Sequence, residues 1–383
     1  MDAPRPNPSS TSSALAQLTG LRFVAAFAVL LSHLDFLGAD PGSWGSWIYE
    51  TLFRQGYCGV SFFYVLSGFI LSQAYGYRLA SGETQLRSYF MLRICRIGPL
   101  HWVMALFFLA WLAAAKGAVP GPGTIGLNML LLHAWSPDFT VHYALNGPSW
   151  SLSDELFFYA AFPWLSRVST RILAPCLVLG LMLITALAVS AMIWQPAYSP
   201  KLEWLFYVAP PVRLADFVTG MLLHRAWQQN WGRRWAGTTA ELCVTLAIPA
   251  AMVGFSLLAL PMPLRWQLAY LPLMAGAVLV FAHGRGAISQ VLRCRWPVLL
   301  GEASFALYLT HRPLVTLAAR LWGGDPALAP VLAAMLPPVC IALSIAVFLL
   351  FERPLLRRMR RRLRQRGQTN DPAGGGLKAW QPS

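Results

Sequence analysis

The chain has 383 residues, of which 56% are hydrophobic and only 12% are charged, and its mean hydropathy is +0.51. An ordinary soluble domain carries about 25% charged residues, so this composition excludes a soluble globular enzyme. One membrane-spanning helix needs about 20 apolar residues, so this chain can hold about ten of them. The composition therefore predicts an all-α, polytopic membrane protein.

The formal net charge of +15 is concentrated near the C-terminus. Nine Lys and Arg residues follow Phe351, against only Glu352 and Asp371. A short basic tail after a last apolar segment is typical of a cytoplasmic anchor that meets anionic lipid. Membrane lipids are therefore the expected partners of the tail, and nucleic acid is not.

Pro, Gly and charged residues divide the chain into successive apolar segments. We expect ten membrane spans, at about 16–37, 57–76, 98–116, 150–166, 172–194, 205–226, 240–260, 266–283, 298–322 and 329–351. A run at 124–135 is too short to cross, which favours a re-entrant or interfacial element. The chain thus divides into an N-terminal segment 1–15, a membrane domain 16–354 and a basic tail 355–383 that is expected to be disordered.

The distribution of positive charge predicts the orientation of these spans. With the N-terminus inside, 22 Lys and Arg residues fall on the cytoplasmic side and five on the outside. Three more, Arg22, Arg213 and Arg312, lie within apolar segments. Because Lys and Arg accumulate in cytoplasmic loops, we expect both termini to be cytoplasmic, which agrees with an even number of spans.

The sequence contains no pattern typical of a bound metal or a resident cofactor. Its six cysteines include no C-x-x-C pair, and it has neither a His-x-x-x-His pair nor an acidic cluster. It also lacks the glycine-rich loops that bind nucleotide phosphates. We therefore expect neither a metal nor a permanently bound cofactor.

The first apolar segment carries two ionisable residues, Arg22 and His33. Eleven helical residues return to nearly the same helix face about 16 Å further along. One face of this helix thus presents a cation near the cytoplasm and an imidazole in the outer half. Ionisable residues inside spans mark functional sites by default, although a snorkelling arginine and a histidine bonded to a neighbouring helix remain the alternative.

Two further arginines, Arg93 and Arg96, precede Gly98-Pro99 and the third span. Three positions apart, they lie on one helix face and can bind phosphate oxygens through their planar forks. Taken alone, such residues are more often ordinary cytoplasmic topology signals.

Two adjacent carboxylates, Asp154 and Glu155, enter the aromatic fourth span within the segment N-G-P-S-W-S-L-S-D-E. They project about 100° apart on a helix, so only one of them can face a site squarely. Ser149 is expected to cap this helix. The alternative is that a helix N-terminus alone favours an acidic residue there.

The other polar residues within spans have both functional and structural interpretations. His311 and Arg312 could act in a site or hold helices together, and Ser67 with Gly68 could mark a close contact between helices. Arg213 and Asp216 stand three positions apart and are expected to pair with each other.

Several ordered motifs between about Leu15 and Pro354 resemble the bacterial acyltransferase family 3, the integral membrane O-acyltransferases. They are Arg22 with His33 eleven positions later, F-Y-V-L-S-G-F, R-I-C-R, W-S-L-S-D-E, S-F-A-L-Y-L-T-H-R-P and a closing F-E-R-P. Two positions depart from the family pattern. Asp154 replaces an aliphatic residue before the glutamate, and Ser61 stands where an acidic residue is frequent.

The resemblance implies an enzyme of the bacterial inner membrane. It takes an acyl group, commonly acetyl, from cytoplasmic acyl-coenzyme A as co-substrate and transfers it to a hydroxyl of a sugar in a surface or exported glycan. It assigns donor binding to Arg22, Arg93 and Arg96 and catalysis to His33 and Glu155. Supporting roles fall to Ser67, Gly68, Tyr308 and His311.

An alcohol needs a base to become a good nucleophile, for which a neutral imidazole is well suited. We therefore expect direct transfer with His33 as general base and Glu155 orienting the imidazole or stabilising its protonated form. A covalent acyl-His33 intermediate is the alternative mechanism. A transporter or flippase of a lipid-linked glycan, or an acyltransferase that modifies a small molecule such as a macrolide, are the alternative functions.

The first prediction concerns topology. A reporter that is active only outside the cytoplasm, fused after Gly367, is expected to give no signal, because positive charge keeps this tail inside. The measurement is reporter activity in intact cells, with a fusion in the loop at 195–200 as the outside control. A strong signal after Gly367 would contradict the whole assignment of spans.

Overall fold

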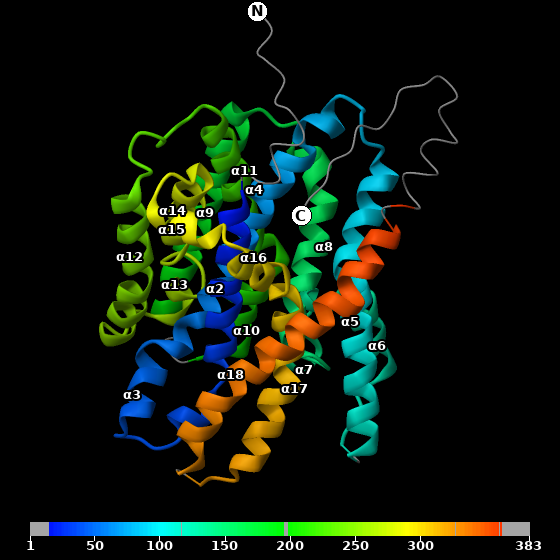
Figure 1. The fold of residues 1–383 in the computed structure, drawn as a ribbon, viewed down its shortest axis with the longest axis vertical. Helices are drawn as coiled ribbons and strands as arrows, with labels where there is room; N and C mark the ends of the chain where they lie inside the picture. Colours follow the sequence, from blue (N-terminus) through cyan, green and yellow to red (C-terminus); the bar gives the residue numbers. More distant parts are fainter. Residues whose placement is uncertain (1–14, 116, 195–197, 326, 360, 362–383) are drawn as a thin grey trace, which may run out of the picture.

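The computed structural model describes residues 15–361 except 116, 195–197, 326 and 360, and every regular element within these residues is a helix (Figure 1). The α-helices are α2 (Ala16–Ser32), α3 (Trp44–Thr51), α4 (Gly59–Ala80), α5 (Leu86–Ala114), α6 (Pro122–Met129), α7 (Phe139–His142), α8 (Trp150–Leu165), α9 (Thr170–Trp194), α10 (Pro200–Glu203), α11 (Pro210–Gln228), α12 (Thr238–Leu257), α13 (Met262–Arg265), α14 (Leu271–His283), α15 (Ala287–Leu292), α16 (Arg295–Glu302), α17 (Ser304–Trp322) and α18 (Leu328–Val347).

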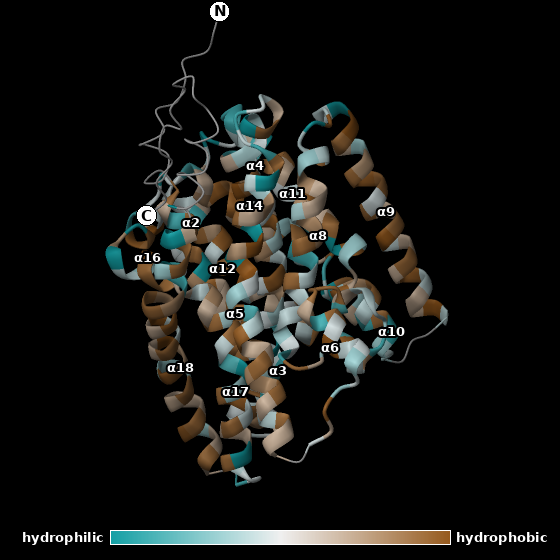
Figure 2. Cartoon of the chain, turned by 90° about the vertical axis from the view of Figure 1, so that its right-hand side faces the viewer, coloured by the Kyte–Doolittle hydropathy of each residue, from teal (hydrophilic) through white to brown (hydrophobic). Residues whose placement is uncertain are grey.

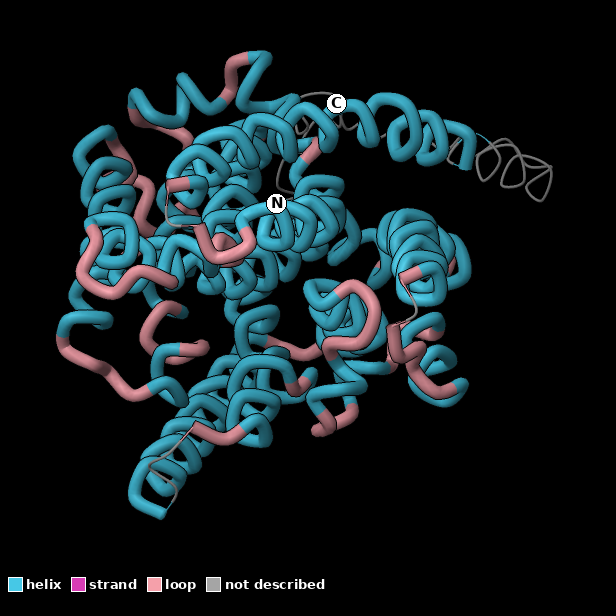
Figure 3. Tube along the Cα trace, turned by 90° about the horizontal axis from the view of Figure 1, so that it is seen from below, coloured by secondary structure: helices cyan, strands magenta, loops and turns pink. Residues whose placement is uncertain are grey.

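Shorter turns connect these helices. Four are 3₁₀ turns, at Asp35–Gly38, Phe53–Cys58, His133–Trp135 and Gly147–Ser149, and two are π turns, at Trp204–Val208 and Phe348–Glu352. The view from below shows the helices packed side by side with short loops between them (Figure 3). Apart from Leu15, the predicted segment 1–15 lies outside the described residues, as do residues 360 and 362–383 of the predicted tail 355–383. Residues 355–359 of that tail continue the last helix, so the expected disorder is wrong for them.

The prediction of an all-α membrane-type fold is confirmed. Every one of the ten predicted segments contains a helix, and five helices are long and apolar enough to cross a membrane: Trp44–Ala80, Leu86–Ala114, Thr170–Trp194, Thr238–Leu257 and Leu328–Met359. The number of crossings and the orientation of the termini stay predictions. The helix α6 (Pro122–Met129) overlaps the predicted short element 124–135 and has eight residues, a length of about 12 Å that cannot span a bilayer.

The apolar helices differ in how far they are buried. In Trp44–Ala80, the range that contains α4, 61% of the most apolar 18-residue window is buried, compared with only 17% in α9 and 11% in α12. Figure 2 shows α9 and α18 hydrophobic over much of their length. Because apolar side chains can face lipid at no cost, α9 and α12 form outer walls and α4 lies inside the bundle.

Glycines allow α4 to approach its neighbours closely. A Cβ atom on Gly68 of α4 would overlap the carbonyl of Phe217 on α11, and one on Gly220 of α11 would overlap the carbonyl of Val65 on α4. Within a membrane the hydrophobic effect does not drive helices together, so they associate largely through van der Waals packing. Small residues favour this packing because they permit close backbone contact. The close-contact interpretation of Gly68 is therefore confirmed.

The second prediction tests this contact. Gly68→Ala is expected to lower the free energy of unfolding by about 1–3 kcal/mol, the range for overpacking a tight interior, because the new methyl group meets backbone atoms. Thermal unfolding in detergent measures it. Gly76→Ala on the same helix, where a Cβ meets nothing within 4 Å, is the matched control and is expected to change stability by less than about 0.5 kcal/mol. Equal effects at the two positions would refute the close-contact argument.

Candidate active site

A cavity of about 160 Å³ lies among α2, α4, α5, α8 and α17. It brings together six of the nine residues that the sequence singled out for binding, catalysis or support, and these come from all five helices. They are Arg22, Ser67, Arg93, Arg96, Glu155 and Tyr308. Residues 22 and 308 are 286 positions apart, so the fold gathers distant motifs into one chamber. Gly68, His33 and His311 are not among the residues that line it.

The three arginines of the cavity differ in what balances their charge. Within the described part of the chain, Arg22 has neither a hydrogen-bond acceptor nor an ion-pair partner among the contacts of the structure. Arg93 donates from Nη2 to the hydroxyl of Tyr75 over 3.2 Å, and its guanidinium carbon lies 5.1 Å from the centre of that ring. Arg22 is thus free to receive an anion, while Arg93 is held by an aromatic face.

Arg96 is paired with a carboxylate from the far end of the chain. Its Nη1 lies 3.1 Å from Oε2 of Glu352, which ends the π turn after α18. The same guanidinium lies 5.0 Å from the centre of the Phe305 ring. Glu352 is buried, so this ion pair joins the last helix to the wall of the cavity.

The two adjacent carboxylates separate as helical geometry requires. Glu155 lines the cavity and accepts a hydrogen bond of 2.6 Å from the hydroxyl of Tyr159, one turn further along α8. Asp154 is fully buried outside the cavity lining and accepts a hydrogen bond of 2.8 Å from the hydroxyl of Tyr64. Only one of the two therefore faces the cavity, as predicted.

His33 and His311 form a second polar centre. Their ring centres are 4.9 Å apart, and His33 stands directly after the last residue of α2. Nδ1 of His33 lies 2.8 Å from the carbonyl oxygen of Val29, and Nδ1 of His311 lies 3.0 Å from that of Leu307. A carbonyl only accepts, so each Nδ1 must carry the proton and each neutral ring keeps a basic lone pair on Nε2.

This arrangement changes the expected partner of His33. The sequence led us to expect that Glu155 orients the imidazole, but the structure does not bring Glu155 and His33 together; the described contacts of Glu155 lie in the cavity. The Val29 carbonyl, one helical turn before His33, fixes the tautomer instead. A backbone group of the same helix thus performs the task assigned to a distant side chain.

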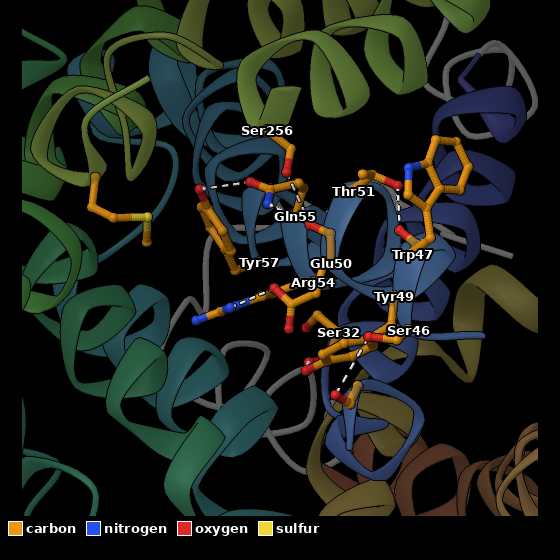
Figure 4. Close-up of polar contacts among 12 residues, drawn as sticks. Ser32, Ser46, Trp47, Tyr49, Glu50, Thr51, Arg54, Gln55, Tyr57 and Ser256 are labelled. Atoms are coloured by element: carbon orange, nitrogen blue, oxygen red, sulfur yellow. Dashed lines mark hydrogen bonds and ion pairs between the residues drawn. The ribbon is translucent and has the colours of Figure 1, made fainter. Parts of the chain in front are cut away.

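The segment after α2 holds the end of that helix in place. The hydroxyl of Tyr49 in α3 donates to the carbonyl of Ser32 over 3.1 Å, next to His33 (Figure 4). Behind α3, Ser256 of α12 donates to the carbonyl of Glu50 over 3.1 Å. The position of His33 is therefore set by α3 as well as by its own helix.

One turn of α17 separates the two polar centres. Tyr308 lines the cavity, and its ring centre lies 6.2 Å from that of His311, three residues later. The histidine pair is therefore one side-chain layer beyond the cavity wall.

Arg213 and Asp216 form a buried ion pair outside the cavity. Nη2 of Arg213 lies 3.0 Å from Oδ2 of Asp216, and both side chains are fully buried. The same nitrogen donates to the hydroxyl of Ser61 over 3.0 Å, and Nε2 of Gln267 donates to Oδ1 of Asp216. The prediction that these two residues pair with each other is confirmed.

Sequence reasoning missed three parts of the site. It did not assign Tyr159, although the spacing of four residues after Glu155 is the signal for a contact on one helix face. It quoted the motif of Glu352 without pairing that residue with Arg96. It also expected Ser149 to cap α8, which is wrong: its hydroxyl turns back and donates to the carbonyl of Asn146 over 2.6 Å.

Within the described ranges, no group of three or more His, Cys, Asp or Glu side chains could hold a metal ion. The arrangement offers instead a cationic chamber and, next to it, two imidazoles with available lone pairs.

Comparison with known proteins gives one consistent result. A family model described as "Acyltransferase domain" matches residues 15–353. Acyltransferase MdmB of Streptomyces mycarofaciens is 29% identical over 331 residues, which cover 81% of each chain. Exopolysaccharide production protein ExoZ of Rhizobium meliloti is 28% identical over 81% of this chain and 92% of its own.

A more distant relative is larger than this chain. Peptidoglycan O-acetyltransferase OatA of Listeria monocytogenes is 23% identical over 78% of this chain and 49% of its own length. No solved structure matches.

Proposed function

Because the chain belongs to the family of the acyltransferase domain, which its match over residues 15–353 shows, we propose that it is a membrane O-acyltransferase acting on a glycan. In this proposal it takes an acyl group, in the first place acetyl, from cytoplasmic acyl-coenzyme A and transfers it to a hydroxyl of a sugar in a surface or exported polysaccharide. Two relatives carry names of this kind, one for exopolysaccharide production and one for peptidoglycan O-acetylation.

The single observation that carries the proposal is the chamber with three arginines beside a pair of basic imidazoles. Coenzyme A carries several phosphate charges, and guanidinium groups bind phosphate through short, charge-assisted hydrogen bonds. The unpaired Arg22 is the first anchor, with Arg93 and Arg96 beside it. Glu155 and Glu352 offset part of the positive charge of these arginines.

The reaction in this proposal takes place at the outer end of α2. An extended pantetheine arm anchored near Arg22 reaches toward His33, about 16 Å along the same helix. As the acceptor oxygen attacks the thioester carbonyl, Nε2 of His33 takes the hydroxyl proton. The carbon–sulfur bond then breaks, and the imidazolium returns this proton to the leaving thiolate. His311 stabilises the charged imidazole across the 4.9 Å contact of the two rings.

A covalent route uses the same residues. Nε2 of His33 would attack the thioester itself, carry the acyl group and pass it to the acceptor hydroxyl in a second step. Labelled acetyl trapped on His33 in the absence of acceptor would select this route.

The third prediction tests the function. Vesicles that contain the full chain, labelled acetyl-coenzyme A and a panel of polysaccharide and peptidoglycan fragments are expected to produce labelled glycan, and His33→Ala is expected to lower this rate by about 10²–10⁴-fold, the contribution of a general base. His283→Ala, a histidine bonded to the Trp231 carbonyl away from the cavity lining, is the matched control.

The outcomes separate the candidate functions. Glycan that crosses the vesicle membrane without gaining label would indicate a transporter or flippase. If label appears only on a small-molecule acceptor such as a macrolide, the acceptor of the proposed reaction is that small molecule and not a glycan. Near-normal turnover by His33→Ala would eliminate both the direct and the covalent mechanism.

The fourth prediction concerns donor binding. Arg93→Lys with Arg96→Lys is expected to raise the Kd for coenzyme A about tenfold or more, because the loss of a hydrogen bond to a charged group costs about 1.5–3 kcal/mol and lysine lacks the planar fork. Calorimetry with coenzyme A measures it, and Arg87→Lys, on the exposed start of the same helix, is the control. An unchanged Kd in the double variant would refute the arginine clamp.

A further inference from the structure

A proline interrupts α17 two residues after His311. In an α-helix the carbonyl of Leu309 would accept a hydrogen bond from the backbone N–H of residue 313, but residue 313 is Pro313, which has none. Leu309 is fully buried. A buried carbonyl without a partner is costly, so another donor must replace the missing N–H.

The side chain of Asn146 supplies that donor. Its Nδ2 donates to the carbonyl oxygen of Leu309 over 3.0 Å, across 163 positions of sequence. Asn146 is fully buried and lies directly before the 3₁₀ turn Gly147–Ser149. A second bond beside it runs in the opposite direction, from the hydroxyl of Tyr308 to the carbonyl of Pro148 over 3.1 Å.

The loop that presents Asn146 is itself braced. The backbone N–H of Ser149 donates to the carbonyl of Asn146 over 2.9 Å, and the hydroxyl of the same serine does so over 2.6 Å. Nε2 of His133 lies 3.3 Å from the oxygen of that hydroxyl. Leu145 adopts a φ of +60°, a conformation that costs free energy for a bulky residue and persists only where surrounding contacts enforce it.

We propose that Asn146 is a positioning residue for the histidine pair, because its amide replaces the missing proline N–H and fixes the turn of α17 that carries His311. The fixed carbonyl of Leu309 lies two residues before His311. The Nδ1 of His311 is held by the carbonyl of Leu307 in the same turn, and its ring lies 4.9 Å from that of His33. Loss of the Asn146 bond therefore moves His311 relative to His33.

The catalytic part of this inference rests on the proposed function, but the structural part does not. Asn146→Ala leaves the Leu309 carbonyl without a donor. Pro313→Ala adds a backbone N–H that can bond the same carbonyl from within the helix. The effects of the two substitutions must therefore depend on each other, which a double-mutant cycle measures.

The first measurement is the release of free thiol from acetyl-coenzyme A by the full chain in nanodiscs, with water as acceptor. The water oxygen bonds the carbonyl carbon, the carbon–sulfur bond breaks, and the water proton passes through His33 to the sulfur. Asn146→Ala is expected to slow this reaction about 10- to 100-fold, as displacement of a catalytic group by about 1 Å does, while the Kd for coenzyme A stays within twofold. Asn146→Ala with Pro313→Ala is expected to recover to within about threefold of the natural chain.

The second measurement does not depend on activity. The ¹⁵N resonances of labelled histidines report which ring nitrogen of His311 carries the proton and at what pH the ring titrates. Asn146→Ala is expected to shift both for His311, and the double variant is expected to restore them. The control combines Asn146→Ala with Pro249→Ala, which removes a proline inside the outer helix α12. This combination is expected to restore neither the protonated nitrogen nor the titration of His311.

The results that would overturn the proposal are clear. Strictly additive effects of the substitutions at 146 and 313, or unchanged His311 resonances in Asn146→Ala, would refute the positioning role. If the histidine resonances respond as expected but no variant and no natural chain cleaves acetyl-coenzyme A, the positioning role stands and the proposed donor fails. If Asn146→Ala does not fold, the double variant Asn146→Ala with Pro313→Ala still tests the proposal. A double variant that folds and has the His311 resonances of the natural chain would support it, because the new backbone N–H of residue 313 then replaces the Asn146 bond to the Leu309 carbonyl.

Discussion

The cost of placing guanidinium groups inside an apolar bundle is the constraint on which the rest of this structure depends. A charge inside a membrane protein is expensive and survives only beside a partner or a hydrated space. Arg213 meets this condition with Asp216 and Ser61, Arg96 with Glu352, and Arg93 with the tyrosine rings. Arg22 alone among these four has no ion pair, hydrogen bond or aromatic ring contact in the described structure, and it faces the cavity. The guanidinium of Arg22 is thus available to bind an anion in the cavity.

The helices that line the cavity differ in how closely they resemble membrane spans. Three of the five, α2, α8 and α17, are absent from the helices that meet the length and hydropathy required of a span, whereas α4 and α5 lie within two of them. These three helices are either short, as α8 is with 16 residues, or interrupted by ionisable side chains. The helices with the most exposed apolar surface, α9 and α12, carry none of the cavity residues. The cavity residues therefore lie on helices other than these exposed apolar walls, and the glycine contacts between α4 and α11 pack the interior of the bundle closely.

Features encoded within a single helix could be predicted from the sequence. The spacing of Arg93 and Arg96, the separation of Asp154 from Glu155 and the pairing of Arg213 with Asp216 all follow from 3.6 residues per turn. Contacts between distant segments could not be predicted in this way. Arg96 and Glu352 are 256 positions apart, and no periodicity relates them.

The expectation for Glu155 shows the same limit. Its neighbours could be derived along α8, but its distance from His33 depends on how α2 and α8 cross. The tautomer of His33 is instead set by Val29, four residues earlier on its own helix. Here the local contact was available in the sequence, since a backbone carbonyl always lies one turn before a helical residue, and the more elaborate partner was not needed.

The two positions that depart from the family pattern converge in space. Ser61 accepts a hydrogen bond from Arg213, whose guanidinium carbon lies 5.1 Å from the centre of the Tyr64 ring. The hydroxyl of Tyr64 in turn donates to Asp154. An uncharged residue at 61 and an acidic residue at 154 therefore meet the same buried arginine and tyrosine cluster, and neither lines the cavity. The departures change how charge is distributed behind the wall, while the arginines and the glutamate that face the chamber remain those of the pattern.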